Sequence, residues 1–213
     1  LLRLYGQTEA FMTTLNRPDD SFQTLETRDG RAVPGVEVQI WDEAGHPAAV
    51  GEEGEAACRG PHRCLGFLND PKRTKAAIDE EGWLRMGDLC RLDERGYLTV
   101  VGRKKEVISR GGYKYSPREV EDILALHPAV SRIAVVRAFD ERLGEKACAF
   151  VVTRDGQTLE LEEVVDYLRE RGVAPFKWPE RLELVEALPT TASGKVQKFI
   201  LEQRLADMDK KER

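Results

Sequence analysis

The residues best suited to do chemistry lie near the end of the chain, in segment 189–195, which reads Pro-Thr-Thr-Ala-Ser-Gly-Lys. Its small residues predict a flexible loop, and the loop delivers one ammonium group at Lys195. Such a point charge suits a reaction in which two anions must approach, for example a carboxylate attacking a phosphate. Taken alone, the segment equally fits a solvated loop lysine that precedes a helix.

A phosphate-binding P-loop is a competing interpretation of the Ser-Gly-Lys sequence. That motif requires a glycine five residues before the glycine of Gly-Lys. Pro189 occupies this position, so the P-loop interpretation fails.

A second candidate region is segment 102–115, where basic side chains surround the pair Gly111 and Gly112. Backbone can approach a ligand closely at such glycines. Residues 106–108 interrupt the basic run and are predicted to form a buried strand, which favours a local phosphate site over a nucleic-acid patch. A solvated basic turn is the remaining alternative. The basic residues are Arg103, Lys104, Lys105, Arg110 and Lys114.

A predicted hairpin precedes this region, with strands at 89–92 and 97–101 joined by a turn at 93–96. Antiparallel pairing would place Leu92 opposite Tyr97 and Asp88 near Val101. Asp88 and Arg103 would then lie at the same end of the hairpin. A carboxylate beside a guanidinium could hold vicinal hydroxyls such as those of a ribose. The alternative is an ordinary surface ion pair, worth roughly 0 to 1 kcal/mol.

The elements that must position these residues fall into two regions. Residues 33–103 are predicted to form short strands at 35–41 and 54–60, separated by a turn at 42–45. A short helix is expected to begin at Asp70-Pro71 and to run through Ile78. Residues 1–5 are predicted to form a buried strand that leads into a polar turn. The missing initiator Met suggests the middle of a larger protein.

Residues 106–213 are expected to form a compact mixed α/β domain. Segment 116–119 predicts a capping box with proline at the first helical position. Strands are predicted at 133–136 and 147–152, followed by a helix over 161–171 that ends at Gly172.

Composition limits the function classes. The 213 residues are 41% hydrophobic and 33% charged, with a net charge of −5, which argues against nucleic acid as the main partner. The sequence contains no apolar run of roughly 18 residues, and a cytoplasmic location is expected. Cys58, Cys64, Cys90 and Cys148 form no Cys-x-x-Cys pair and are predicted to be structural thiols.

Four motifs in order resemble the C-terminal part of the adenylate-forming enzymes, a family of acyl-CoA synthetases, luciferases and peptide-synthetase adenylation domains. Each motif is weak alone, but their order and spacing cover nearly the whole chain. Segment 172–179 and the C-terminal motif are most similar to fatty and related carboxylic acid:CoA ligases. The motifs are 5–9 (Tyr-Gly-Gln-Thr-Glu), 87–88 (Gly-Asp), 102–121 (Gly-Arg, Gly-Gly and Pro-Arg-Glu-Val-Glu) and 189–195.

The resemblance implies nucleotide contacts in the first region. Tyr5 matches the aromatic residue that packs on adenine, and Thr8 matches a hydroxyl that contacts phosphate. Glu9 matches a carboxylate associated with magnesium. Asp88 and Arg103 match the residues that hold the ribose hydroxyls.

The resemblance also implies roles in the second region and at its start. Lys105 matches a hinge about which the C-terminal domain swings, and Lys114 matches a basic residue that contacts phosphate. Lys195 matches the catalytic lysine of adenylation. Gly111 and Gly112 match a turn that lines the pantetheine channel of CoA.

The implied fold class is α/β (α+β). Residues 1–103 would be the β-barrel-like tail of a large N-terminal AMP-binding domain, and residues 104–213 a small, mobile, mixed α/β domain. The implied reaction uses ATP, Mg²⁺ and CoA to convert a carboxylic acid, fatty or related, to acyl-AMP and then to acyl-CoA, and a homodimer is compatible with it. Two residues depart from the family pattern: Met86 replaces a small hydroxyl residue and Tyr113 replaces a commonly polar one.

The family's glycine-rich phosphate loop and most of its acyl pocket have no counterpart in the sequence, so the isolated chain is expected to show little ATP–pyrophosphate exchange. Two alternatives stay open. The chain could be a truncated nucleotide- or CoA-binding module, or a subunit that completes a separate chain. A nucleic-acid-binding protein ranks behind both and would bind DNA with strong salt dependence.

Overall fold

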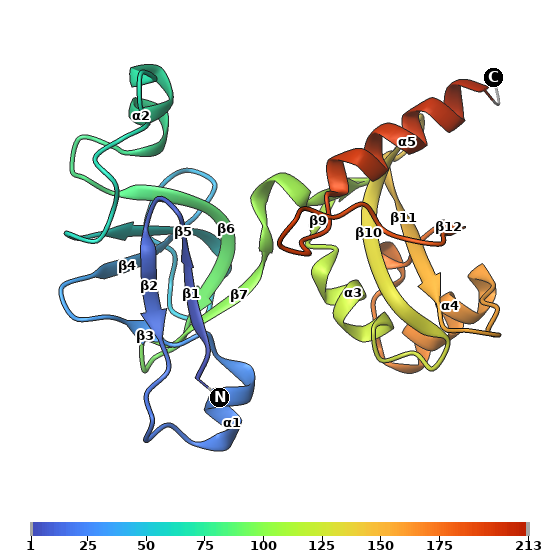
Figure 1. The fold of residues 1–213 in the computed structure, drawn as a ribbon, viewed down its shortest axis with the longest axis horizontal. Helices are drawn as coiled ribbons and strands as arrows, with labels where there is room; N and C mark the ends of the chain where they lie inside the picture. Colours follow the sequence, from blue (N-terminus) through green and yellow to red (C-terminus); the bar gives the residue numbers. More distant parts are fainter. Residues whose placement is uncertain (1, 212–213) are drawn as a thin grey trace. The chain divides into compact units, whose positions relative to one another are not determined.

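The computed structural model describes residues 2–211 and divides the chain into two compact units, Leu1–Lys105 and Glu106–Arg213 (Figure 1). Each unit has its own sheets and its own buried core. The mixed α/β fold class is confirmed.

The first unit is built from two antiparallel sheets. One contains β1 (Leu4–Gln7), β2 (Phe11–Leu15) and β3 (Arg31–Ala32), and the other contains β4 (Glu37–Trp41), β5 (Gly54–Arg59), β6 (Leu84–Leu92) and β7 (Leu98–Arg103). An isolated bridge between Arg31 and Tyr97 links their edges, and the Leu98 amide donates to Gly30 O at 2.8 Å. Within residues 2–211 no pairing joins β1 to β4, so the sheets resemble part of a barrel but do not close.

The strand predicted over residues 1–5 is shorter and less buried than expected. The strand β1 begins at Leu4. The side chains of Leu2 and Leu4 are exposed, and only Tyr5 enters the core. Leu1 lies outside the described residues. Successive side chains of a strand point to opposite faces, and only the face that carries Tyr5 packs on the core. Gly6 follows at a register shift, where an added Cβ would lie 1.7 Å from the carbonyl oxygen of Phe11. This close approach requires glycine at position 6.

The segment around β4 and β5 confirms the predicted turn, although burial does not alternate as expected. Ile40 and Trp41 at the end of β4 are both buried, because Ile40 joins the central core while Trp41 packs against Trp83 on the opposite face. The Gly45 amide donates to Asp42 O at 3.1 Å and closes the turn.

Two short helices belong to the first unit, α1 (Phe22–Thr27) and α2 (Pro71–Ala77). The helix predicted at Asp70-Pro71 is confirmed as α2. The Asp70 carboxylate accepts a hydrogen bond from the Arg73 amide at 2.9 Å, which satisfies an otherwise unpaired donor of the first turn.

The register predicted for the hairpin of β6 and β7 is wrong in detail. Leu92 pairs with Leu98, not with Tyr97, because the connection includes Tyr97. A register shift between Leu89 and Cys90 then brings Asp88 directly opposite Arg103. The predicted proximity of Asp88 and Arg103 is therefore confirmed, although a β-bulge was needed to produce it.

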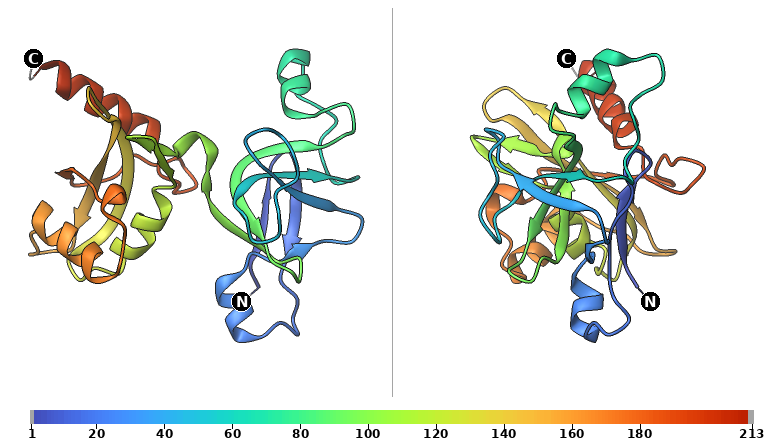
Figure 2. Two further views of the ribbon diagram at one scale, coloured as in Figure 1. Left: turned by 180° about the vertical axis from the view of Figure 1, so that it is seen from behind. Right: turned by 90° about the vertical axis from the view of Figure 1, so that its left-hand side faces the viewer.

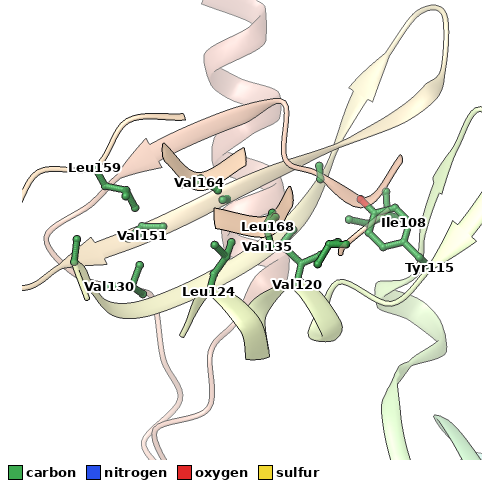
Figure 3. Close-up of a cluster of buried hydrophobic side chains, with 14 residues drawn as sticks. Ile108, Tyr115, Val120, Leu124, Val130, Val135, Val151, Leu159, Val164 and Leu168 are labelled. Atoms are coloured by element: carbon green, nitrogen blue, oxygen red, sulfur yellow. The ribbon is translucent and has the colours of Figure 1, made fainter. Parts of the chain in front are cut away.

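The second unit has a five-stranded sheet with helices on both faces (Figure 2). Helices α3 (Arg118–Leu124) and α4 (Leu161–Glu170) cover one face through the core drawn in Figure 3, and α5 (Lys198–Lys211) packs on the other. The predicted strands at 133–136 and 147–152 are confirmed as parts of longer ones. The strands are β8 (Ile108–Arg110), β9 (Tyr113–Tyr115), β10 (Val130–Asp140), β11 (Gly144–Thr153) and β12 (Arg181–Leu184).

Two local predictions in the second unit need correction. Ser116 Oγ accepts from the Arg118 amide at 3.3 Å, but Glu119 pairs with Lys177 at 2.6 Å and does not complete a capping box. The reciprocal box is found at the start of α4. Of residues 106–108, which were predicted to form a strand, only Ile108 lies in one, at the start of β8. Lys104–Glu106 form a 3-10 turn instead.

The end of α4 confirms the prediction at Gly172, which has a φ of +72°. A further 3-10 turn, η2 (Pro175–Lys177), leads from there toward β12. Among residues 2–211, no helix is both long and apolar enough to cross a bilayer.

Candidate functional site

The clearest polar cluster of the first unit surrounds the carboxylate of Asp88. The hydroxyl of Tyr5 donates to Asp88 Oδ2 at 2.8 Å, and Arg103 Nε lies 3.3 Å from Asp88 Oδ1. The Asp88 side chain is 13% exposed, whereas that of Arg103 is 49% exposed. A largely buried carboxylate that accepts a hydrogen bond from Tyr5 and lies beside the exposed guanidinium of Arg103 has the geometry expected for holding vicinal hydroxyls.

Tyr5 is part of the core rather than an open platform. The residue is 8% exposed and packs in a cluster with Met86, Cys58 and Cys90. Burial, followed by the nearby Cys90 and Asp88, raises the pKa of the Tyr5 phenol far above its ordinary value, so the hydroxyl stays protonated and can donate. The contact of Tyr5 with adenine stays a prediction.

Met86, one of the two departures from the family pattern, is 6% exposed and belongs to the same core cluster as Tyr5. A thioether has no hydroxyl with which to bind a ligand. The side chain at this position therefore contributes packing under the Asp88 cluster.

Thr8 and Glu9 lie in the turn between β1 and β2. Thr8 is exposed, and the half-buried Glu9 carboxylate is 3.9 Å from Arg73 Nη2. The Cys64 amide donates to Glu9 O at 2.7 Å and fixes the turn. Residues 2–211 contain no group of three or more potential metal-binding side chains. A single carboxylate fits Mg²⁺ only where substrate phosphates and water supply the other ligands, as they commonly do for this ion.

Three basic residues of segment 102–115 are held in ion pairs, two of which the sequence did not predict. Arg103 pairs with Asp88, Lys104 Nζ pairs with Glu55 Oε2 at 2.9 Å, and Arg110 pairs with Glu180. Arg103 and Lys104 also belong to the first unit, whereas Arg110 and Lys114 belong to the second. Sequence proximity therefore misrepresented how these charges are used.

Lys105 is the last residue of the first unit and is exposed within the 3-10 turn. Lys114 is exposed on β9. The hinge role of Lys105 and the phosphate contact of Lys114 stay predictions.

Gly111 and Gly112 form the tip of the hairpin that joins β8 to β9. Their φ angles are +56° and +89°, and both residues are exposed. These left-handed conformations favour glycine. The neighbouring Tyr113 ring stacks on Phe176 with centroids 4.8 Å apart, so the second departure from the family pattern holds the hairpin against η2.

Lys195 lies at the end of a hydrogen-bonded turn, which is more ordered than the flexible loop expected. The Thr191 amide donates to Lys195 O at 2.9 Å, the Gly194 amide donates to Thr191 O at 2.9 Å, and an isolated bridge pairs Thr190 with Val196. The Lys195 side chain is exposed, and within residues 2–211 its ammonium has no ion-pair partner. A cation that is fixed at its backbone and free at its tip is suited to meet an anionic ligand.

The sequence-predicted residues therefore divide between the two units. The structure brings Tyr5, Asp88 and Arg103 together in the first unit. Gly111, Gly112, Lys114 and Lys195 belong to the second. Sequence reasoning missed the Tyr5 to Asp88 hydrogen bond, because nothing local links residues 83 positions apart.

Sequence reasoning also missed Lys198, a largely buried lysine at the start of α5. The only signal was a second lysine closely following Lys195.

Two family models match the chain. The model of the AMP-binding enzyme family matches residues 1–68, and the model of the AMP-binding enzyme C-terminal domain matches residues 119–195. The chain therefore belongs to the adenylate-forming, AMP-binding family and corresponds to a C-terminal portion of its members.

Several relatives are acid ligases. The medium-chain fatty-acid–CoA ligase of Escherichia coli (strain K12) is 46% identical over 202 residues, which are 94% of this chain and 36% of that protein. Enterobactin synthase component E of the same organism is 39% identical over 206 residues, 97% of this chain and 38% of that protein. The chain thus spans little more than a third of the length of these relatives.

Solved structures give the same result. The crystal structure of ATP-bound MatB from Rhodopseudomonas palustris has a TM-score of 0.91 at 32% identity, over 98% of this chain and 41% of that one. An o-succinylbenzoate CoA synthetase from Bacillus subtilis, solved with its acyl-adenylate intermediate, has a TM-score of 0.86 at 31% identity, over 94% of this chain and 40% of that one.

Proposed function

We propose that this chain is the C-terminal part of an AMP-forming carboxylic acid:CoA ligase. The observation that carries the proposal is the pairing of two features in one chain: the Asp88 cluster with Tyr5 and Arg103, and the exposed Lys195 on an ordered turn. The first suits a ribose and the second suits a phosphate. Together they match a nucleotide-dependent reaction on an anionic acid.

In the first step, a carboxylate oxygen of the acid attacks the α-phosphorus of ATP. A new oxygen–phosphorus bond forms, the bond to the β-phosphate oxygen breaks, and pyrophosphate leaves. Asp88 and Arg103 hold the ribose hydroxyls and thereby fix the α-phosphate in the line of attack. The ammonium of Lys195 offsets the negative charge that gathers as the two anions meet.

Mg²⁺, when bound through Glu9 and the substrate phosphates, would neutralise phosphate charge. The exposed hydroxyl of Thr8 lies in the same turn as Glu9 and can donate to a phosphate oxygen. Glu9 is held for this role by the hydrogen bond from the Cys64 amide to its backbone.

In the second step, the sulfur of CoA attacks the acyl carbonyl carbon. A carbon–sulfur bond forms, the acyl–oxygen bond breaks, and AMP leaves. The hairpin tip at Gly111 and Gly112 has no side chains to obstruct a narrow ligand such as pantetheine, and the basic residue Lys114 follows it on β9. We assign CoA to this hairpin.

We further propose that the first unit is the tail of a large N-terminal domain and that the second is a small domain that moves about Lys105. The exposure of Lys105 at the end of the first unit supports this assignment. A fatty or related acid is the proposed substrate class, because relatives include a medium-chain fatty-acid–CoA ligase. A cytoplasmic location and a homodimer stay predictions.

The proposal is tested on the full-length protein, meaning this chain with any residues that its gene encodes before Leu1. A panel of carboxylic acids is supplied with MgATP, and pyrophosphate release and then CoA thioester are followed. We expect both products with at least one fatty or related acid. If no acid of the panel gives pyrophosphate release, or if none gives a CoA thioester, the proposal is overturned.

A second candidate is a nucleotide- or CoA-binding module without activity of its own. The Asp88 cluster supports it, because a carboxylate beside a guanidinium could hold a ribose without any catalytic group. The discriminating observation is the reading frame upstream of Leu1. An in-frame phosphate-loop sequence indicates the ligase, whereas a start codon indicates the module.

A further inference from the structure

The start of α5 contains a buried ionic network that the proposed reaction does not use directly. Lys198 Nζ lies 3.1 Å from Glu106 Oε2 and 2.7 Å from Glu121 Oε1. The three side chains are 14%, 24% and 17% exposed, respectively. A lysine in this setting has exchanged most of its hydration for two carboxylates.

Lys198 stands at an unfavourable place for a lysine. It is the first residue of α5, and the positive end of a helix dipole repels a cation. Burial adds a desolvation cost. Two carboxylates offset both effects, so the network constrains where the start of α5 can lie.

Glu121 extends the network to the sheet. Its Oε1 also accepts a hydrogen bond from the Val135 amide at 2.6 Å. Because β10 is an edge strand, this amide has no partner strand on its outer side. Figure 1 shows α5 on one side of β10 and α3, which carries Glu121, on the other. Lys198 and Glu121 therefore join the two helical layers around the edge of β10.

The network has two functional neighbours. Lys198 follows the turn that ends at Lys195, and the Gln197 amide between them donates to Pro189 O at 2.8 Å. Glu106 is the first residue of the second unit and directly follows Lys105. The network thus connects the base of the Lys195 turn to the residue next to the proposed hinge.

We propose that Lys198 is a positioning residue for Lys195. Through Glu121 and Glu106, Lys198 fixes the turn that carries Lys195 to α3, to β10 and to the start of the second unit, next to the proposed hinge. A movement about Lys105 would then carry the Lys195 turn as a rigid part of its unit. This inference rests on the proposed function, because it assigns Lys195 the adenylation step.

The first test measures the turn itself, without activity. In the 213-residue chain, we expect Lys198→Met to accelerate amide hydrogen exchange at Gly194 and Gln197 by about tenfold or more, since their partners lie within the turn. The matched control is Arg137→Met, which removes another cation that ties β10 to α5, through Glu202 at 3.1 Å. The ion pairs of Arg137 within residues 2–211 are with Glu145 and Glu202, outside the Lys195 turn, so amide exchange in the turn should not change.

The second test measures the two half-reactions in the full-length protein. We expect Lys198→Met to lower the rate of adenylation by about tenfold to a hundredfold, because a small misplacement of a catalytic group has this effect. Thioester formation from preformed acyl-AMP should stay within about threefold. Lys198→Arg should restore most of the adenylation rate, because a guanidinium can bridge two carboxylates.

Unchanged exchange in the turn, or equal losses in both half-reactions, would overturn the inference. If Lys198→Met does not fold, Glu106→Gln replaces it, with the same pattern expected at smaller size. Failure of the proposed function gives a different result. The unmodified full-length protein would then form no acyl-AMP, while Lys198→Met would still accelerate amide hydrogen exchange in the turn.

Discussion

The hydroxyl of Tyr5 donates a hydrogen bond to Asp88 Oδ2 at 2.8 Å and thereby joins the two sheets of the first unit. Tyr5 belongs to β1, and Asp88 belongs to β6. The same carboxylate is the proposed ribose ligand. One hydrogen bond therefore contributes both to the stability of the unit and to the orientation of a binding group.

Replacement of Tyr5 by phenylalanine should lower the free energy of unfolding of the first unit by about 1 to 3 kcal/mol, because the buried Asp88 loses a donor. Denaturant unfolding followed through Trp41 and Trp83 reports on this unit. Tyr113→Phe is the control, since Tyr113 is 62% exposed and should give no change. A Tyr5→Phe protein as stable as the unmodified one would show that the bond contributes nothing net.

Alkaline pH should destabilise the first unit through the same residue. The pKa of Tyr5 is raised by burial above its unfolded value, so the phenol contributes stability that is present below that value and is lost as pH rises beyond it. The unfolded pKa is about 10. We expect the free energy of unfolding to fall above this pH, and to fall less in Tyr5→Phe. An identical decline in both proteins would show that the Tyr5 phenol does not cause the loss of stability at alkaline pH.

The buried thiols should be protected from alkylation. Burial raises the pKa of Cys58 to about 11 and that of Cys148 to about 12, and both side chains are buried, as is Cys90. At pH 8 we expect iodoacetamide to modify the partly exposed Cys64 first, because the thiolate is the reactive form. Mass spectrometry over time measures the order. Early labelling of Cys148 would contradict the described packing of the second unit.

The raised pKa values of Cys58 and Cys148 also make the free energy of unfolding fall at alkaline pH. Each thiol contributes stability below the unfolded pKa of about 8.5, and that contribution is lost as pH rises from there through the folded value. Cys148→Ala should therefore reduce the pH dependence of unfolding of the second unit between about pH 9 and 12. Trp178 fluorescence can follow this unit.

Gly6→Ala should unfold or strongly destabilise the first unit. The new methyl group would meet the Phe11 carbonyl at 1.7 Å, and backbone cannot move away cheaply in a paired strand. We expect a loss of more than about 3 kcal/mol. Gly51→Ala is the matched control, because Gly51 has a φ of +84° but open space around it, and should cost about 1 kcal/mol. Equal effects of the two changes would argue against the close approach.

The sequence predicted most elements whose signals are local. Asp70 before a proline indicated the start of α2, and Gly172 indicated the end of α4, because capping and left-handed φ depend on neighbouring residues. The order of four motifs predicted the family. Asp88 and Arg103 were correctly expected to be neighbours, since antiparallel pairing follows from the two strands.

The features that the sequence did not predict depend on distant contacts. The bulge near Leu89 set the true register, and no local pattern indicates an inserted residue. The ion pair of Lys104 with Glu55 removed a charge from the expected phosphate cluster, and its partner lies on another strand. Lys198 was overlooked because a lysine at the start of a helix is usually solvated.

Lys195 is the proposed cation of the adenylation step. The most direct measurement compares Lys195→Ala with the control Lys210→Ala, an exposed lysine on α5 that pairs with Asp207. In the full-length protein we expect Lys195→Ala to lower ATP–pyrophosphate exchange on the order of a hundredfold or more while thioester formation from preformed acyl-AMP changes far less. Lys210→Ala should match the unmodified protein in both assays. Equal loss of the two half-reactions in Lys195→Ala, or no loss of ATP–pyrophosphate exchange, would contradict the assignment of Lys195 to the adenylation step.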